Sequence, residues 1–244
     1  MIFLNYENFK SIIDNTDNIV FFGGAGVSTE SSIPDFRSET GLYKTKSNFS
    51  YPPEVMLSHS FFVKYPKEFY EFYKSKMIYK EARPNPAHLA LAVLEKRGKL
   101  KAVITQNIDG LHQLAGSENV LELHGSIHRN YCTKCRKFFD LEYILTSKEA
   151  IPKCDVCEGV VKPDVVLYEE GLDMEIMRKS IEYIKDADVL IVGGTSLAVY
   201  PAAGLVDYFK GGKLILINKS STPYDKRADI VIHDSIGMVL SVVL

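Results

Sequence analysis

Six short apolar runs divide the chain, and each predicts a strand that is buried on both of its faces. The runs are rich in β-branched residues and too short for helices, and none alternates cleanly between apolar and polar positions. They occupy residues 19–22, 102–105, 120–123, 189–192, 214–217 and 230–232.

Helical patterns lie between several of these runs. Asn85 can cap a helix that has Pro86 at its first position. The apolar residues of 87–97 share one face, and Gly98 follows where a C-terminal cap belongs. Two further helices are expected, one from the capping residue Asp173 to Lys185 and one from Pro201 to a point before Gly211. This alternation predicts an α/β fold with a doubly wound, parallel, Rossmann-like sheet.

Two segments interrupt the alternation and predict a second, smaller domain. In residues 35–83 an aromatic helix is expected to pack as a lid, with Phe62, Phe69, Phe72, Tyr73 and Met77 at helical spacing. Residues 128–162 contain the cysteines. We expect the larger domain to comprise residues 1–34, 84–127 and 163–244, and the smaller one to comprise the insertion 35–83 and the module 128–162.

The four cysteines form two Cys-x-x-Cys pairs, Cys132 with Cys135 and Cys154 with Cys157. This spacing predicts four thiolates arranged tetrahedrally around one zinc ion. Because four protein ligands leave no position for water or substrate, the expected role of the Zn²⁺ is structural. Disulfides are the weaker alternative, since the first ten residues do not resemble a signal peptide and the chain exceeds the size of domains that need such bridges.

Charge and hydropathy exclude several classes of function. The 244 residues include 29 basic and 31 acidic side chains, so a broad field that attracts nucleic acid or anionic lipid is not expected. No apolar run approaches the ~20 residues needed to span a bilayer. We therefore expect a monomeric cytoplasmic protein with no nucleic-acid or membrane partner, in which reduced thiols are available to zinc.

Two glycine-rich turns follow predicted strands. The first, at residues 23–29, could let backbone N–H groups approach a pyrophosphate, although Thr29 stands where the dinucleotide fingerprint has its third glycine. The second, Gly193-Gly194-Thr195-Ser196, ends another strand, and Asn218 ends the next. Either turn alone is common in proteins, but open α/β sheets bind ligands at this edge.

Polar residues converge on the same edge. Residues 106–109 end a strand with an amide, an apolar residue and a carboxylate, although an Asp-Gly turn often caps only its own backbone. Residues 35–37 and His124 lie beside further strand ends. A structural role is expected for four other histidines, His59, His88, His128 and His233. The role of His112 stays open.

Taken together, these residues resemble the sirtuins, the NAD-dependent protein lysine deacylases. The matching stretches are residues 24–37 (GAGVSTESSIPDFR), residues 105–109 (TQNID), His124-Gly125, the two cysteine pairs, and residues 194–201 (GTSLAVYP). They occur in the family's order and span nearly the whole chain, which looks like a compact bacterial member.

The resemblance implies where NAD and an acylated protein would bind. NAD would be lined by Ala25, Thr29, Arg37, Gln106, Thr195, Ser196, Asn218 and Ile236, with Phe36, Ile108 and Asp109 around the nicotinamide. The peptide carrying the acyl-lysine would lie as a strand beside Val165, Val166, Leu167 and Tyr168. In the family the acyl oxygen attacks C1′ of the nicotinamide ribose, and the products are nicotinamide, lysine and O-acyl-ADP-ribose. His124 would be the general base, as its usual pKa near ~6.5 allows, and Asn107 would orient ribose or water.

Three positions depart from the family pattern. Ser32 replaces a glycine, which is tolerable where φ is negative. Tyr168-Glu169-Glu170 replaces Phe-Gly-Glu, and the Glu169 carboxylate predicts a preference for basic peptides. Tyr73 is followed at the third place by Lys76, where the desuccinylating branch has arginine. Because lysine lacks the bidentate fork, we expect acetyl and other neutral acyl groups.

Other functions remain open on the sequence alone. A protein ADP-ribosyltransferase would need the same NAD site and the same histidine. A zinc-ribbon binding module on a nucleotide-sensing domain would need no catalysis. A dehydrogenase is disfavoured, because no proton-relay pair is evident beside the nicotinamide pocket.

Overall fold

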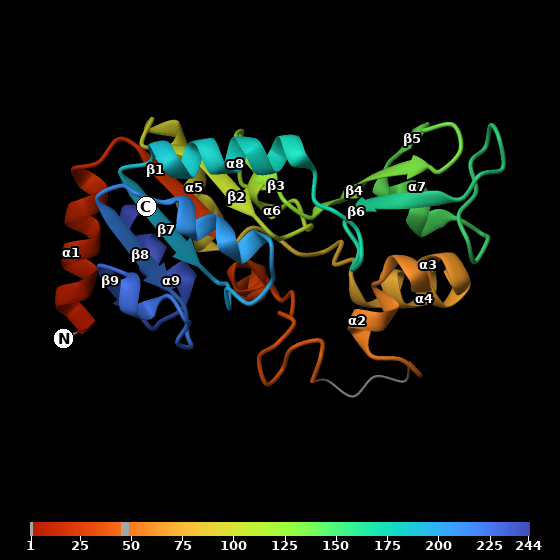
Figure 1. The fold of residues 1–244 in the computed structure, drawn as a ribbon, viewed down its shortest axis with the longest axis horizontal. Coiled ribbons are helices and arrows are strands. Elements are labelled where there is room, and N and C mark those ends of the chain that lie inside the picture. The colour runs from red at the N-terminus through yellow and green to blue at the C-terminus, as the bar shows by residue number, and fades with distance from the viewer. Residues whose placement is uncertain (1, 45–48) are drawn as a thin grey trace.

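The computed structural model describes residues 2–44 and 49–244. Six strands form one sheet in the order β3-β2-β1-β7-β8-β9, and every neighbouring pair is parallel (Figure 1). Their bounds are β1 Ile19–Gly23, β2 Leu100–Thr105, β3 Val120–Glu122, β7 Val189–Gly193, β8 Lys213–Ile217 and β9 Ile230–Ile232. All six predicted strands and the doubly wound α/β fold are confirmed.

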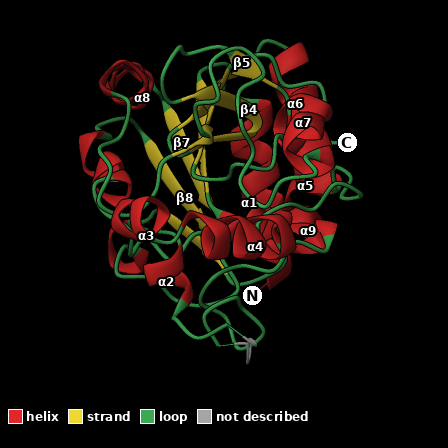
Figure 2. Ribbon diagram, turned by 90° about the vertical axis from the view of Figure 1, so that its right-hand side faces the viewer, coloured by secondary structure: helices red, strands yellow, loops and turns green. Residues whose placement is uncertain are grey.

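The strands of this sheet bury both of their faces. On β1 the side chains of Ile19 and Phe21 enter one apolar cluster, and those of Val20 and Phe22 enter another. The first cluster is covered by α1 Ile2–Asp14, α5 Pro86–Lys96, α9 Ile236–Leu240 and the 3-10 turn η4 Ser241–Val243. The second is covered by α8 Met174–Asp186 and η2 Ala202–Tyr208. Figure 2 shows α8 and α5 on opposite sides of the sheet.

The predicted caps explain where the helices begin. Asn85 Oδ1 accepts the N–H of Ala87 at 2.9 Å, and Gly98 follows α5 with a φ of +74°. Asp173 accepts the N–H groups of Glu175 and Ile176 at 2.8 and 3.0 Å. Both helices are confirmed. The expected helix after Pro201 begins in the right place, but it is the 3-10 helix η2.

In the insertion at residues 35–83, the described residues, 35–44 and 49–83, form three short helices instead of one aromatic helix. They are α2 Pro53–Met56, α3 His59–Lys64 and α4 Pro66–Lys76. Ser58 caps α3 through the N–H of Phe61, and Pro66 has no N–H with which to continue α3, so a new helix starts there. The expected aromatic residues still meet, because Phe62, Phe69, Phe72 and Tyr73 are buried in one cluster and Met77 packs against it.

The second sheet is antiparallel, in the order β5-β4-β6. It consists of β4 Gly125–Cys132, β5 Phe138–Phe139 and β6 Val161–Val165, with α7 Leu141–Thr146 against β4. Figure 1 places it beside α2, α3 and α4, away from the large sheet. The remaining elements are η1 Ala25–Ser31, α6 Leu111–Leu114 and η3 Asp225–Arg227. Among the described residues, no helix is long and apolar enough to cross a membrane.

Candidate active site

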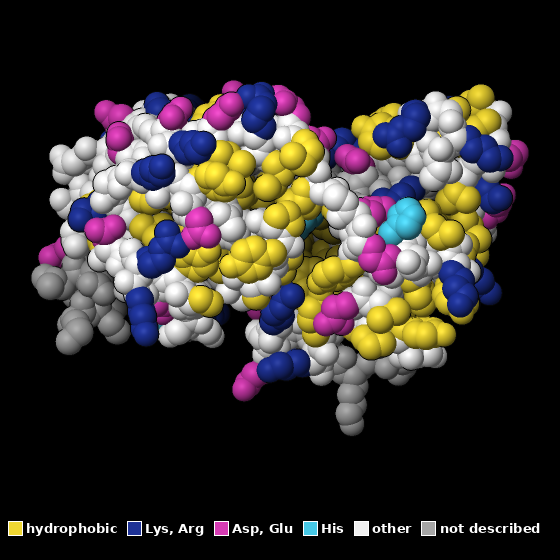
Figure 3. Space-filling model, viewed as in Figure 1, with side chains coloured by type: hydrophobic (Ala, Val, Ile, Leu, Met, Phe, Trp, Pro, Cys, Tyr) yellow, Lys and Arg dark blue, Asp and Glu magenta, His cyan; other side chains and the backbone are white. Residues whose placement is uncertain are grey.

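A cavity of about 760 Å³ lies between the carboxyl edge of the large sheet and the elements around the small sheet. Figure 3 shows the hollow, with hydrophobic side chains gathered around it. Every residue that the resemblance assigned to NAD, catalysis or peptide lines it: Ala25, Thr29, Phe36, Arg37, Gln106, Asn107, Ile108, Asp109, His124, Val165, Val166, Leu167, Tyr168, Thr195, Ser196, Asn218 and Ile236. The structure therefore brings the whole predicted set together.

The two glycine turns pack directly against each other. The N–H of Gly26 donates to the carbonyl of Gly194 at 2.8 Å, and a Cβ on Gly26 would lie 2.8 Å from the Gly194 Cα. Gly194 itself has a φ of +61°. Close backbone approach thus accounts for both glycines. The first turn leads into the 3-10 helix η1, not into an α-helix as a dinucleotide fingerprint would suggest.

Amide side chains connect the ends of three strands. Asn218 Oδ1 accepts the N–H of Thr195 at 2.8 Å, and the Thr195 hydroxyl accepts from Gln106 Nε2 at 3.1 Å. The Nδ2 of Asn218 is buried and, in the described part of the chain, has no hydrogen-bond partner. Because a buried amide N–H₂ left unpaired costs about 1–3 kcal/mol, this group fits a ligand acceptor in the cavity, such as a ribose or phosphate oxygen of NAD.

A buried serine orders the carboxylate and amide of residues 106–109. Ser28 is 1% exposed, and its hydroxyl donates to Asp109 Oδ2 at 2.7 Å while accepting from Asn107 Nδ2 at 3.0 Å. The other carboxylate oxygen of Asp109 accepts the N–H of Leu111 at 2.9 Å. Sequence reasoning missed Ser28. It lies in the first glycine turn, 81 residues from Asp109, and only the fold reveals the contact.

His124 lies in the turn between β3 and β4 and faces the cavity. Its Nδ1 is 2.9 Å from the carbonyl oxygen of Gln106, and since a carbonyl can only accept, Nδ1 carries the proton. The neutral ring then has its lone pair on Nε2. Burial lowers the pKa of His124 below its usual value, and the Gln106 carbonyl partly opposes this. The residue is consequently neutral at pH 7 and can act as a base.

Gly125, next to His124, tolerates no side chain. Its φ is +74°, and a Cβ there would lie 1.8 Å from the carbonyl oxygen of Asp164 on the neighbouring strand β6. The contact between these two backbones starts β4 directly after the histidine. The His-Gly pair therefore fixes the base at the junction of the two sheets.

The four cysteines cluster in two matching turns. All four sulfurs lie within 4.8 Å of one another, with 3.4 Å between those of Cys132 and Cys157 and 3.6 Å between those of Cys135 and Cys154. Tetrahedral ligands at a Zn–S distance of about 2.3 Å would be roughly 3.8 Å apart, whereas a disulfide needs about 2 Å. The donor set fits a structural zinc ion, and no disulfide is formed.

The Sir2 family model matches residues 24–201 of the chain. The chain belongs to the Sir2 family. This confirms the sirtuin resemblance, and the match includes the glycine turns, His124 and both cysteine pairs.

Curated members of the Sir2 family match nearly the whole chain. The NAD-dependent protein deacetylase of Clostridium tetani is 70% identical over 234 residues, which cover 96% of this chain and 95% of that protein. The protein of the same name from Clostridium acetobutylicum is 69% identical over 235 residues, covering 96% of each.

Solved Sir2 structures share the fold. A Sir2 protein with a deacetylated p53 peptide and 3′-O-acetyl ADP ribose superposes with a TM-score of 0.88 at 38% identity, covering 96% of this chain and 95% of that chain. A Sir2 complex with p53 peptide and NAD⁺ gives 0.84 at 36% identity, covering 97% and 96%.

The backbone at Ser32, which replaces a glycine of the Sir2 pattern, differs from expectation. Ser32 has a φ of +64°, in the left-handed region, so the condition of a negative φ is wrong. The residue ends η1, where its N–H donates to the Thr29 carbonyl at 3.1 Å. A non-glycine residue here carries a backbone cost of about 1–2 kcal/mol.

The histidines outside the Sir2 site have structural partners or are buried. His128 and His233 each place a ring nitrogen near a backbone carbonyl oxygen, that of Asp109 at 3.1 Å and that of Asn218 at 3.0 Å. His88 Nδ1 accepts the N–H of Asn85 at 3.3 Å. His112 is 1% exposed, and among the described residues neither of its ring nitrogens has a hydrogen-bond partner.

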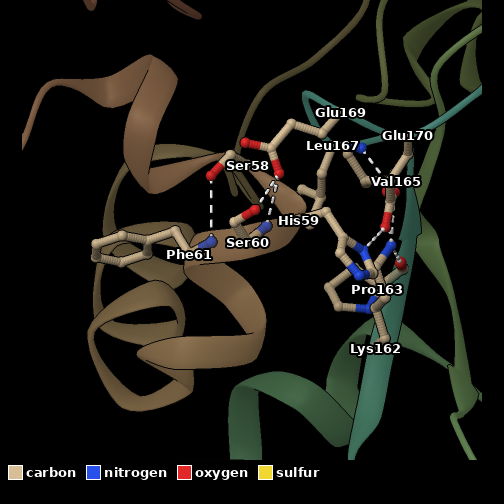
Figure 4. A network of polar contacts seen from close by, with 10 residues as sticks. All are labelled: Ser58, His59, Ser60, Phe61, Lys162, Pro163, Val165, Leu167, Glu169 and Glu170. Carbon is tan, nitrogen blue, oxygen red and sulfur yellow. Dashed lines mark hydrogen bonds and ion pairs between the residues drawn. The ribbon is translucent and has the colours of Figure 1, made fainter.

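Glu169 and Glu170 fasten the end of the predicted peptide-binding segment to α3 and β6 (Figure 4). The Glu169 carboxylate accepts the N–H and hydroxyl of Ser60 at 2.9 and 2.6 Å. Glu170 accepts from Lys162 Nζ at 3.1 Å and lies 2.9 Å from His59 Nδ1. Although Glu169 lines the cavity, its carboxylate is thus directed to the start of α3, which leaves less of its charge for a basic peptide.

Proposed function

We propose that the protein removes acetyl and other neutral acyl groups from lysine side chains of proteins in an NAD-dependent reaction. The observation that carries the proposal is the neutral His124, with its Nε2 lone pair, in one cavity with the buried Asn218 amide and the predicted peptide segment. Relatives that are 70% and 69% identical are named NAD-dependent protein deacetylases, which supports it.

Each group of residues has a proposed role. NAD, when bound, supplies the ribose carbon that receives the acyl oxygen. Arg37, Thr195 and Asn218 hold its phosphates and riboses, while Asp109, fixed by Ser28, accepts from the carboxamide. His124 takes a proton from a ribose hydroxyl through Nε2 and passes it toward the leaving lysine. Asn107 orients the ribose or a water molecule without adding charge.

The peptide with its acyl-lysine lies as an added strand beside residues 165–168. Strand addition gives affinity through backbone hydrogen bonds, which suits substrates of varied sequence. Solved Sir2 relatives include one bound to an acetylated peptide, which supports this class of partner. Tyr73 is buried, and Lys76, which lines the cavity, lacks the bidentate fork with which arginine would hold an acidic acyl group, so neutral acyl groups remain the proposed substrates.

The domain division and cellular setting belong to the same proposal. Residues 1–34, 84–127 and 163–244 form an NAD-binding domain, and residues 35–83 and 128–162 form a smaller one, with the cleft between them. The protein acts as a cytoplasmic monomer, where four thiolates stay reduced and bind zinc. It acts without nucleic-acid or membrane partners.

Mass spectrometry of an acetyl-lysine peptide, incubated with the protein with and without NAD, tests the activity. We expect the acetyl mass to be lost only with NAD, together with formation of O-acetyl-ADP-ribose. A succinyl-lysine peptide of the same sequence should react much more slowly. An unchanged acetyl peptide with consumption of NAD would contradict the proposal and favour ADP-ribosyl transfer.

A further inference from the structure

Two tyrosines join two segments of the chain that line the cavity. The hydroxyls of Tyr43 and Tyr168 are hydrogen-bonded to each other, although 125 positions separate them in the chain. Tyr43 belongs to residues 35–44, called here the cofactor loop, and Tyr168 ends residues 165–168, called here the peptide segment. Both side chains line the cavity. Burial raises the pKa of the Tyr43 hydroxyl, so the group stays protonated and can donate.

Tyr43 is closely linked to the two residues of the cofactor loop that are proposed to touch NAD. The loop folds back on itself, because the N–H of Tyr43 donates to the Phe36 carbonyl at 2.9 Å. The ring of Tyr43 lies 5.4 Å from the ring of Phe36, and the Arg37 guanidinium lies 5.4 Å from the Tyr43 ring. A ligand that orders Phe36 and Arg37 therefore also orders Tyr43.

Backbone hydrogen bonds hold Tyr168 in place. Its N–H donates to the Leu57 carbonyl at 3.0 Å, and its carbonyl accepts the N–H of His59 at 2.9 Å. The next residue, Glu169, binds Ser60 at the start of α3 (Figure 4). The Tyr168 hydroxyl is consequently a fixed point, toward which the cofactor loop can close.

We propose that this tyrosine clasp, the hydrogen bond between Tyr43 and Tyr168, couples binding of the dinucleotide to binding of the peptide. The inference rests on the proposed function, in which the cofactor loop contacts NAD and the peptide segment binds the acylated peptide. A peptide strand that pairs with residues 165–168 adds to the contacts that hold Tyr168, so the Tyr168 hydroxyl keeps the cofactor loop closed over NAD more firmly when the peptide is bound. Thermodynamic linkage requires the reverse effect, so NAD strengthens peptide binding by the same factor.

The clasp depends on side chains in which this chain departs from the family pattern noted above. A phenylalanine at position 168 would have no hydroxyl for Tyr43, and a glycine at position 169 would have no carboxylate for Ser60. Tyr43 and Tyr168 are thus positioning residues that act through Phe36, Arg37 and the peptide backbone.

Calorimetric titration measures the coupling directly. ADP-ribose, which is not turned over, is titrated into the protein with and without a saturating acetyl-lysine peptide, and the ratio of the two Kd values is the coupling factor. We expect tighter binding with peptide in the wild type. Tyr43→Phe, Tyr168→Phe and the double variant should each lower the coupling factor by about 2- to 10-fold, the effect of one hydrogen bond.

The pattern among the variants is decisive. The double variant should match each single variant, because either change removes the same bond. Tyr208→Phe removes a hydroxyl from a tyrosine that is 42% exposed and does not line the cavity, and it should leave the coupling unchanged. Additive losses in the double variant, equal coupling in wild type and variants, or no coupling in the wild type would each contradict the clasp.

The deacetylation assay keeps this test separate from the proposed function. A wild-type protein that forms no O-acetyl-ADP-ribose contradicts the proposed function itself. An active wild type whose coupling factor survives Tyr43→Phe contradicts the clasp alone. In the variants, the peptide KM at low NAD should rise more than kcat falls at saturation of both substrates.

Discussion

The two sheets are stabilised in different ways. The large sheet is covered on both faces by apolar clusters that helices and strands supply together. The small sheet packs Ile127 and Val165 against the aromatic cluster of α2, α3 and α4. Near the cysteines it has only a much smaller cluster, consisting of Cys132, Phe139, Ile144, Cys154 and Val161. Two of those five residues are zinc ligands. The comparison indicates that the large sheet buries apolar surface on both faces, whereas the end of the small sheet near the cysteines has little apolar core and is expected to depend on a metal ion.

Removal of zinc should have the largest effect, and it should affect the small sheet while leaving the large sheet folded. Structural zinc contributes about 10–16 kcal/mol to the folding of zinc-finger peptides, so chelation or Cys132→Ser should unfold the small sheet and abolish deacylation. Hydrogen exchange should rise in β4, β5 and β6 and stay low in β1 and β7. Lys134→Ser, inside the same knuckle but not a ligand, is the matched control. Full activity without bound zinc would refute this.

At the junction of the two sheets, His124→Ala should lower the catalytic rate without lowering the stability of the fold. Loss of a general base lowers kcat by about 10²- to 10⁴-fold, while the melting temperature should change little. His233→Ala is the control, since that ring also meets a backbone carbonyl but does not line the cavity. A wild-type rate in His124→Ala would remove the histidine from the mechanism.

The pH dependence of catalysis follows from the same residue. Burial lowers the pKa of His124, so the neutral form that acts as a base persists below the usual value near ~6.5. Activity should therefore fall only as the pH drops through that lowered pKa. An acid limb of the kcat/KM profile centred above pH 7 would contradict this assignment.

The region around the large sheet should lose stability at low pH. Burial lowers the pKa of His88 to about 4, and burial also lowers that of His112, whose ring lies 4.7 Å from the ring of His88. Since the unfolded state binds more protons, stability is complete above about pH 6.5 and is lost as the pH falls toward 4. The loss is roughly 3 kcal/mol for His88. It should appear in urea unfolding measured at several pH values.

His88→Gln tests the assignment, because glutamine can still accept from the Asn85 N–H but does not titrate over this range. The variant should show a shallower loss of stability between pH 6.5 and 4. An unchanged slope would mean that other groups control acid unfolding.

The smallest expected effect concerns the backbone at Ser32. Glycine removes the cost of the left-handed conformation, about 1–2 kcal/mol, but gains entropy in the unfolded chain worth about 0.4–1 kcal/mol. Ser32→Gly should therefore stabilise the protein by roughly 0.5 kcal/mol. Ser31→Gly is the contrast, since it removes the hydroxyl that accepts from Asn85 at 3.0 Å and should destabilise. Calorimetric melting of both variants decides between these signs.

The sequence predicted most of the large sheet because its signals are local. Apolar runs mark strands, and Asn85 and Asp173 mark helix starts regardless of what packs nearby. The small sheet escaped this reasoning. Its longest strand, β4, mixes polar and apolar residues and is defined by pairing with β6, at positions 29 to 40 residues away. The break at Pro66 was visible in the sequence, yet aromatic spacing suggested continuity across it.

The candidate site was predictable where the family motifs cover it and not elsewhere. The lining residues could be named because they occur in recognisable stretches. Ser28 was not, since a serine in a glycine turn gives no sign of a partner 81 residues away. The positive φ at Ser32 and the contact between Tyr43 and Tyr168 also depend on tertiary packing, which no local pattern encodes.

Strand β4 also separates the cysteine cluster from the catalytic base. It starts one residue after His124 and ends at the first zinc ligand, Cys132. The part of β6 that pairs with β4 runs only from Val165 to Val161, because β4 bulges between Ser126 and Asn130. At about 3.3 Å per residue, the two ends of β4 are therefore roughly 13 Å apart, more than one screening length in physiological salt. Exchange of zinc for cobalt should therefore leave the reaction rate intact. The coloured ion would become an optical reporter of whether the small sheet is folded while the enzyme turns over.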